Sequence, residues 1–153
     1  MPDLRIRELQ AGDLRNGFFE TLNALRPTGD ADPGAAAAIF AQVRRNPDTV
    51  VAVAELDGRI VGTGTLYLLR KFLYGGSTAA HIEDVAVAAD RQRAGVGRAV
   101  IESLLAGAQK AGCYKTVLYC EDDVLPFYRT LGFRHATNGM RFDHAPPPAR
   151  GAS

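Results

Sequence analysis

The sequence predicts one α/β domain, in which a mixed, mostly antiparallel sheet with a central parallel strand pair carries helices on both faces. Two β-branched runs, residues 49–55 and 60–70, flank an Asp57-Gly58 turn, which is the signal of an antiparallel hairpin. Farther along, a strand at 81–88 is followed by a helix and another strand, a crossover that places two strands in parallel. Amphipathic helices before and after these strands can cover both faces of the sheet.

The N-terminal segment is expected to form a strand and then a helix. Residues 4–9 alternate apolar and polar side chains, as a strand with one buried face does. Asp13 is placed to cap the helix that follows. The inward stripe of that helix has helical spacing and consists of Leu14, Phe18, Leu22 and Leu25.

A second helix and the hairpin complete the first half. The helix is expected over 35–45, and three of its side chains are expected to point inward: Ile39, Phe40 and Val43. Gly62 and Gly64 interrupt the second hairpin strand, which predicts a bulge or a close approach of another backbone. Residues 71–80 are expected to be a loop.

The second half follows the β-α-β-α pattern. A helix over 95–111 ends at Gly112, a residue typical of helix C-termini. Residues 114–120, rich in β-branched and aromatic side chains, predict the next strand. Asp123 can cap a short helix at 124–131, whose first turn accommodates a proline.

Two short closing strands, 133–135 and 140–142, are expected after this helix.

A chain of 153 residues with 46% hydrophobic and 23% charged side chains fits a single domain. The domain is assigned to residues 1–144, and the Pro-rich residues 145–153 are expected to be disordered.

Composition excludes several classes of function. A net charge of +1 gives no reason to expect nucleic acid or a membrane surface as a partner. The chain has no apolar run of membrane-span length and no leader pattern, so a cytoplasmic location is predicted. Cys113 and Cys120 lie seven residues apart across a predicted strand and face opposite sides, which excludes a disulfide between them. No His/Cys spacing predicts a metal site.

A Gly- and Arg-rich turn between the strand at 81–88 and the following helix is the main functional motif. Residues 92–97 read Gln-Arg-Ala-Gly-Val-Gly and bring small residues to a helix N-terminus, where free N–H groups and the helix dipole favour an anion. Glu83 and Asp84 lie just upstream. The pattern predicts a phosphorylated cofactor held beside an acid/base site.

This turn resembles the Gln/Arg-x-x-Gly-x-Gly/Ala signature of the GNAT superfamily of N-acetyltransferases. The run 127–133, Phe-Tyr-Arg-Thr-Leu-Gly-Phe, is similar to the Tyr-bearing helix of that family. Further segments narrow the resemblance to its glucosamine-6-phosphate N-acetyltransferase branch: 19–25, 39–48, 60–66, 70–73, 81–85 and 112–115. The resemblance covers about residues 4 to 142.

The resemblance implies acetyl-coenzyme A as co-substrate and an intertwined homodimer, in which the partner chain supplies part of each sugar site. It implies these cofactor-binding residues: Val85, Ala86, Val87, Gln92, Arg93, Ala94, Gly95, Val96, Gly97, Arg98, Tyr128 and Arg129. It implies these residues for an amino-sugar phosphate: Lys71, Phe72, Leu73, Tyr74, Glu83, Asp84, Tyr114, Lys115 and Arg141. No metal is implied.

Acyl transfer to an amine fits these residue types. Glu83 or Asp84 can accept the proton that the amine must lose, directly or through water. A strand N–H can stabilise the charged tetrahedral intermediate, and Tyr128 can protonate the departing thiolate. The phosphate of the acceptor calls for cations. His81 alone is interpreted as a satisfied structural histidine.

The acceptor half departs from the family pattern. The family has a carboxylate where this chain has Tyr119, an Asn at Val124, a more polar residue at Tyr74 and an Arg at Asp143. Three alternatives therefore stay open: another amino sugar or small primary amine as acceptor, a non-catalytic acetyl-coenzyme A-binding module, and a covalent route through Cys120.

Overall fold

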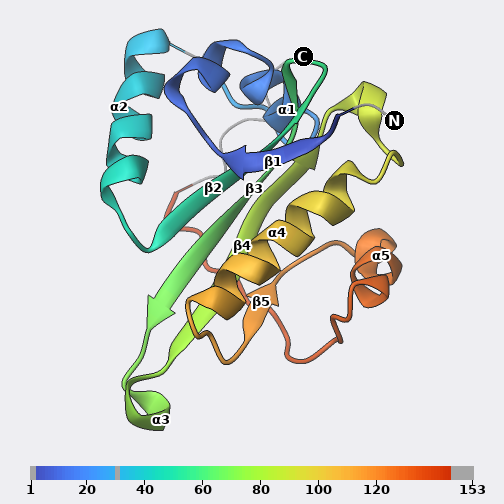
Figure 1. Ribbon diagram of the computed structural model, residues 1–153. Helices are drawn as coiled ribbons and strands as arrows, with labels where there is room; N and C mark the ends of the chain where they lie inside the picture. Colours follow the sequence, from blue (N-terminus) through green and yellow to red (C-terminus); the bar gives the residue numbers. More distant parts are fainter. Residues whose placement is uncertain (1–2, 30–31, 146–153) are drawn as a thin grey trace.

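A five-stranded sheet in the order β1-β2-β3-β4-β5 organises the computed structural model, which describes residues 3–29 and 32–145 (Figure 1). The strands are β1 (Arg5–Glu8), β2 (Thr49–Leu56), β3 (Arg59–Arg70), β4 (Thr78–Val87) and β5 (Thr116–Leu118). The first four pair antiparallel in sequence order, and β5 pairs parallel to β4. The predicted mixed sheet with a parallel pair is confirmed.

Helices connect these strands and cover the sheet. The helical elements are η1 (Ala11–Arg15), α1 (Phe18–Asn23), α2 (Pro33–Arg45), α3 (Leu73–Gly76), η2 (Ala89–Arg91), α4 (Val96–Lys110), η3 (Asp122–Val124) and α5 (Leu125–Thr130). None of them, within the described ranges, is long and apolar enough to span a membrane.

Alternate residues of β2 belong to two separate cores, one on each face of the sheet. Ala52 and Ala54 join the core beneath α4, whereas Val51 and Val53 join a second core that includes side chains of α1 and α2. α4 crosses one face of the sheet in Figure 1. The prediction of helices on both faces is therefore confirmed, as is the period-two pattern on which it rests.

The predicted single helix from Asp13 is wrong. The chain forms η1, turns at Gly17 with φ 94°, and begins α1 at Phe18. A side chain at Gly17 would place its Cβ 2.5 Å from the carbonyl oxygen of Ile60, so the sheet forces this break. Asp13 caps no α-helix; it is buried and binds Arg7.

Two of the expected inward side chains also point outward. Ile39 is 61% exposed, because α2 packs through Phe40 and Val43 instead. Leu25 lies beyond the end of α1 and is exposed. The error at Ile39 arises because helical spacing defines a stripe but not its centre. The error at Leu25 arises because α1 ends before this residue.

Of the two forms of the prediction for Gly62 and Gly64, the bulge is confirmed, whereas the atoms that approach the glycines belong to side chains and not to another backbone. A Cβ on Gly62 would lie 2.5 Å from Val96 Cγ1, and one on Gly64 would lie 2.9 Å from Leu104 Cδ1. Helix α4 therefore rests directly on the backbone of β3. The register between β2 and β3 also shifts near Gly62.

A second irregularity lies in β4. Thr63 and Thr65 of β3 pair with Ala86 and Glu83, so β4 holds one extra residue. Asp84 is the extra residue, and its φ of 54° is unusual for any residue other than glycine. The parallel pairing of β4 with β5 extends only to Ile82. Beyond this bulge, β4 is free of β5.

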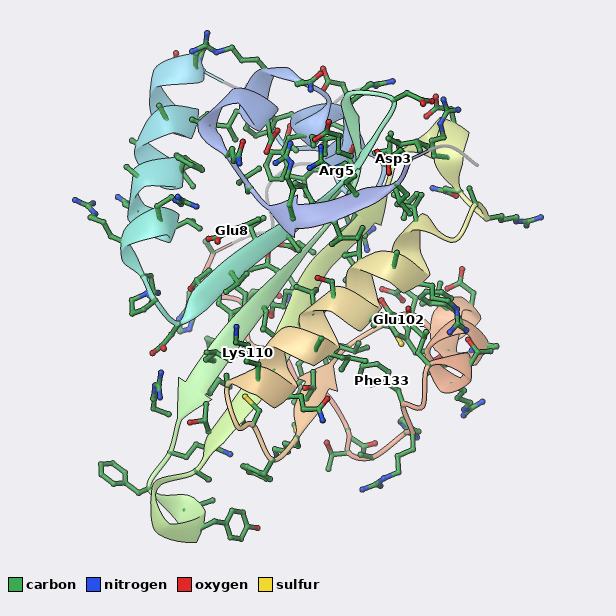
Figure 2. The ribbon with its side chains drawn as sticks, viewed as in Figure 1. Asp3, Arg5, Glu8, Glu102, Lys110 and Phe133 are labelled. Carbon is green, nitrogen blue, oxygen red and sulfur yellow. The ribbon has the colours of Figure 1, made fainter. Side chains whose placement is uncertain are left out.

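The C-terminal part differs most from expectation. Residues 133–135 and 140–142 are not in strands, β5 is short, and α5 has Val124 rather than Asp123 as its N-cap. The parallel pair consequently lies at the edge of the described sheet. Phe133 packs against the core between α4 and α5 (Figure 2). The predicted disordered tail lies almost entirely outside the described residues.

Candidate active site

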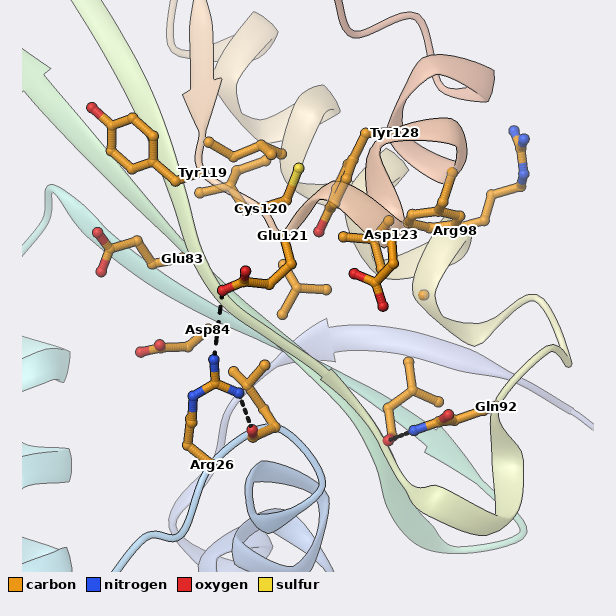
Figure 3. A pocket seen from close by; sticks show the side chains of 18 of the residues that line it. Arg26, Glu83, Asp84, Gln92, Arg98, Tyr119, Cys120, Glu121, Asp123 and Tyr128 are labelled. Carbon is orange, nitrogen blue, oxygen red and sulfur yellow. Dashed lines mark hydrogen bonds and ion pairs between the residues drawn. The ribbon is translucent and has the colours of Figure 1, made fainter. Parts of the chain in front are cut away.

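A cavity of about 980 Å³ opens where β4 and β5 stop pairing. One wall is the bulged half of β4 together with the start of α4. The other wall is the loop after β5 together with α5, and Figure 3 shows side chains of both walls facing the space between them. The bulge at Asp84 is therefore the backbone feature that creates the cavity.

The N-terminus of α4 forms an anion cradle at one end of the cavity. Its N-cap, Gly95, has φ 82° and receives no side-chain cap, so the first N–H groups of a fifteen-residue helix stay available. Arg93 precedes it with φ 66°. Gln92 donates to the carbonyl oxygen of Val87 at 3.4 Å and ties the turn to β4. Such a cradle suits a phosphate or pyrophosphate.

The two arginines beside the cradle are held differently. Arg98 donates to Glu102 at 3.1 Å and to Thr130 Oγ1 at 3.2 Å, which links α4 to α5. Figure 3 shows its guanidinium directed away from the cavity. Arg93 is exposed and lines the cavity. Arg93 is thus the cation of this turn better placed to meet an anion.

Glu83 and Asp84 line the cavity where β4 bulges. Both carboxylates are exposed, and Figure 3 shows them on the side opposite Tyr128. The pKa of Tyr67, on the neighbouring strand, is raised by its burial and by the charges of Asp84 and Glu83. The charges of both carboxylates therefore act on the side of the sheet where the Tyr67 hydroxyl lies.

Tyr128 is the hydroxyl donor of the opposite wall. Its ring packs edge-on against Phe127 at 5.1 Å and Phe133 at 5.7 Å. Burial raises the pKa of its phenol, and a charge on Cys120 would raise it further. A phenol that keeps its proton in this way is suited to protonate a thiolate.

Cys120 lines the same cavity but is a poor nucleophile. Burial raises the pKa of its thiol, and the charges of Asp122, Glu121 and Asp123 raise it further. The neutral thiol does not favour the covalent route. Both cysteines of the chain are free.

The cavity is also lined by residues that sequence reasoning did not select for the site. Leu25 and Arg26 come from the segment after α1, and Glu121, Asp123 and Phe127 come from the segment after β5. Arg26 and Glu121 lie 3.9 Å apart across the cavity (Figure 3). These segments are distant in sequence. The sequence analysis had marked the part after β5 through Tyr119, Cys120, Val124 and Tyr128, but nothing had marked the part after α1.

The structure brings eleven of the predicted site residues into this cavity: Glu83, Asp84, Val85, Val87, Gln92, Arg93, Gly95, Gly97, Arg98, Tyr128 and Arg141. Ala86 and Val96 are buried, so only their backbones can contribute. Arg129 lines a second cavity of about 510 Å³ between β5 and residues 133–141. Ala94 is exposed and lines neither cavity.

Six predicted substrate residues cluster elsewhere, at the end of the β3–β4 hairpin. They are Lys71, Phe72, Leu73, Tyr74, Tyr114 and Lys115, and none of them lines either cavity. Lys71 Nζ donates to the hydroxyl of Tyr114 at 3.3 Å, and Tyr74 packs on the same ring at 5.2 Å. Figure 1 shows α3, which belongs to this tip, projecting from the molecule. Within one chain, the tip and the cavity are separate.

Comparisons with known proteins agree with this geometry. The sequence model of the Acetyltransferase (GNAT) family matches residues 13–133. The glucosamine 6-phosphate N-acetyltransferase of Trypanosoma brucei brucei is 39% identical, over 92% of this chain and 96% of its own. That of Arabidopsis thaliana is 34% identical, over 89% and 93%. A crystal structure of the Arabidopsis enzyme superposes with a TM-score of 0.90 at 32% identity, covering 94% of this chain and 99% of that one.

Proposed function

Because the chain belongs to the GNAT family of acetyltransferases, we propose that it transfers the acetyl group of acetyl-coenzyme A to the amine of glucosamine 6-phosphate. The observation that carries the proposal is a single cavity with an anion cradle at one end, carboxylates on one wall and a protonated phenol on the other. Relatives that carry this activity in their names match the chain over most of its length.

The co-substrate is proposed to lie along the free half of β4. Residues 85–87 no longer pair with β5, so their backbone groups can bind the pantetheine arm as a strand would. Residues 92–98 would bind the pyrophosphate, since the uncapped helix N-terminus and Arg93 both favour an anion. The thioester then lies between Glu83 and Tyr128.

The reaction follows from this placement. The acceptor ammonium loses a proton to a carboxylate of Glu83 or Asp84, and its nitrogen attacks the thioester carbon. The C–N bond forms first, and the C–S bond breaks when the tetrahedral intermediate collapses. Tyr128 supplies a proton to the thiolate and is reprotonated by the second proton that the nitrogen releases. A backbone N–H of β4 stabilises the oxyanion of the intermediate. Transfer is direct, because the thiol of Cys120 is held neutral.

We propose that the enzyme acts as a homodimer. Within the described residues β5 is an edge strand, and the segment that follows it exposes Met140 and Phe142. Edge strands and exposed apolar side chains favour association with another chain. The hairpin tip that carries Lys71 and Lys115 would then complete the acceptor site of the partner. The cytoplasmic location stays a prediction.

Another amino sugar is the second candidate acceptor, and Tyr119 is the observation that favours it. An exposed aromatic ring replaces a carboxylate at the cavity. In addition, Asp143 forms an ion pair with Arg141 at 2.6 Å, which partly neutralises a cation proposed to bind the phosphate. Both features alter the polar groups that an acceptor would meet.

Thiol release from acetyl-coenzyme A, measured over a panel of amines, tests the proposal. Glucosamine 6-phosphate should give the highest kcat/KM, and a higher value for another amine would transfer the assignment to that amine. Tight binding of acetyl-coenzyme A by calorimetry without turnover of any amine would support a non-catalytic module.

Substitution of Tyr128 tests the chemistry separately. Tyr128→Phe should lower kcat by about 10²-fold, most clearly above neutral pH, where other proton donors become scarce. Binding of acetyl-coenzyme A should change little. An unchanged kcat would remove Tyr128 as the acid.

A further inference from the structure

His81 is a partly buried polar residue that the proposed reaction does not use. It lies two residues before Glu83 on β4, so both side chains project from the same face of the strand. Among the described residues, its Nε2 atom is buried and has no hydrogen-bond partner. A buried, unpaired donor costs about 1–3 kcal/mol, so a purely structural role explains this atom poorly. The expectation of a satisfied structural histidine is therefore wrong.

The nearest acidic group explains the orientation of the ring. His81 Nε2 lies 3.5 Å from Glu83 Oε1, at the outer limit of a hydrogen bond. Hydrogen bonds of catalytic groups are often long before substrate binds and shorten in the complex. A small rotation of Glu83 would therefore satisfy the buried nitrogen and hold the carboxylate in one position.

Tyr119 packs against one side of the His81 ring. Its ring packs edge-on against the His81 ring with centroids 5.1 Å apart. The imidazole side chain consequently keeps only 20% of its surface exposed, whereas the Glu83 carboxylate stays 51% exposed at the cavity. Gly139 in turn lies against the Tyr119 ring, where a Cβ would approach to 3.2 Å. The aromatic residue that replaces the expected carboxylate thus covers part of the imidazole ring.

We infer that His81 is a positioning residue, which donates from Nε2 to Glu83 and aims that carboxylate at the acceptor amine. The inference rests on the proposed function and assigns the role of proton acceptor to Glu83 rather than Asp84. Three titratable groups face His81 from the elements packed around it: Glu83 on its own strand, Tyr67 opposite on β3 and Tyr119 after β5. Of these, only the carboxylate is an acceptor that carries charge near neutral pH.

A spectroscopic test addresses the contact without requiring turnover. The ¹⁵N shifts of the His81 ring report which nitrogen carries the proton. In the wild-type chain the proton should reside on Nε2, and in Glu83→Gln this preference should weaken. The same tautomer balance in both proteins would overturn the contact, whatever the acceptor proves to be.

A kinetic cycle tests the consequence for catalysis, using whichever amine the wild-type enzyme acetylates. His81→Phe keeps the ring that packs on Tyr119 but removes the donor. It should lower kcat about tenfold, leave KM for acetyl-coenzyme A unchanged, and move the acidic limb of the pH–rate profile to higher pH. The limb moves because the carboxylate loses a donor that favours its ionised form.

Two further variants keep the cycle decisive. His81→Gln retains a donor at similar reach and should recover most of the rate; it also serves if the Phe variant does not fold. In a Glu83→Gln background, His81→Phe should have no further effect on kcat. Additive losses in the double variant, or an acidic limb that does not move, would overturn the inference. His144→Phe, at an exposed histidine away from the cavity, is the matched control. Failure of the proposed function would show differently, as absence of wild-type transfer to glucosamine 6-phosphate.

Discussion

Gly62→Ala tests whether α4 is seated on the sheet as closely as the structure shows. The new Cβ would lie 2.5 Å from Val96 Cγ1 and 3.1 Å from the Cβ of Ala54. Gly62 does not have a positive φ, so the backbone itself accepts alanine and only the contact opposes it. Val96 is 2% exposed, and its branched side chain has one favoured rotamer in a helix. Overpacking of this kind costs about 2–3 kcal/mol.

The clash should be relieved by a second substitution. Val96→Ala alone removes two methyl groups from the core and should cost about 2 kcal/mol. The double variant should be at least about 2 kcal/mol more stable than the sum of the two losses, because the methyl at residue 62 fills the space left at residue 96. Val96 is also the first residue of α4, so displacement of the helix in Gly62→Ala should raise KM for acetyl-coenzyme A, and Val96→Ala should restore it.

Thermal unfolding measures these differences directly. For a chain of this size 1 kcal/mol corresponds to about 3 °C in Tm, so Gly62→Ala should melt about 6–9 °C below the wild type. Gly107→Ala is the control: its Cβ would lie 3.5 Å from Leu66 Cδ2, an ordinary contact, and alanine favours a helix. It should melt at or above the wild-type temperature. A Gly62→Ala variant with an unchanged Tm, or strictly additive losses, would refute the seating of α4.

Three further predictions concern charge. Asp13→Asn should cost about 2–3 kcal/mol, since it breaks the 2.7 Å ion pair of a buried carboxylate with Arg7. That ion pair lowers the pKa of Asp13 below 3.8. The ion pair therefore stabilises the folded chain fully above this pH, and the stabilisation is lost as pH falls through the folded-state pKa. Acid unfolding, followed by circular dichroism, should consequently begin at higher pH in the variant. Tyr119→Glu adds a like charge near Glu83 and should move the acidic limb of the pH–rate profile to higher pH, because a like charge disfavours the ionised carboxylate. An unmoved limb would show that residue 119 and Glu83 do not interact. Cys120→Ser should keep kcat within about twofold, and an acetylated wild-type enzyme seen by mass spectrometry would contradict this.

Local chemistry made much of the fold predictable. Asp57 and Gly58 adopt the positive φ angles of the predicted turn, and Gly112 ends α4 with φ 78°. These features depend on neighbouring residues alone. The break at Gly17 and the absence of closing strands could not be predicted in this way. The break depends on Ile60, forty-three residues away, and a closing strand depends on a pairing partner that local sequence does not specify.

The candidate site likewise has one part that depends on neighbouring residues and one part that depends on contacts between distant segments. Glu83, Asp84 and residues 92–97 are near one another in the chain, so the strand and the turn that carry them were predicted together with their chemistry. The rest of the cavity is lined by segments nearly a hundred residues apart in sequence, and no spacing rule links Arg26 to Glu121. Burial of Val96 likewise follows from the contact with Gly62, which a motif cannot reveal.

The bulge at Asp84 shifts the alternation of inward and outward side chains along β4 by one residue. Before it, the even-numbered residues Ala80 and Ile82 belong to the core beneath α4; after it, the odd-numbered Val85 and Val87 pack against that core. If residue 84 were deleted, side chains would alternate regularly between the two faces of the sheet from Ala80 to Val87. Val85 and Val87 would still face the core beneath α4, because the loss of one residue and the loss of the bulge cancel each other. The extra residue therefore does not decide which side chains of β4 face the core; it alters the course of the backbone, which leaves β5 beyond Ile82.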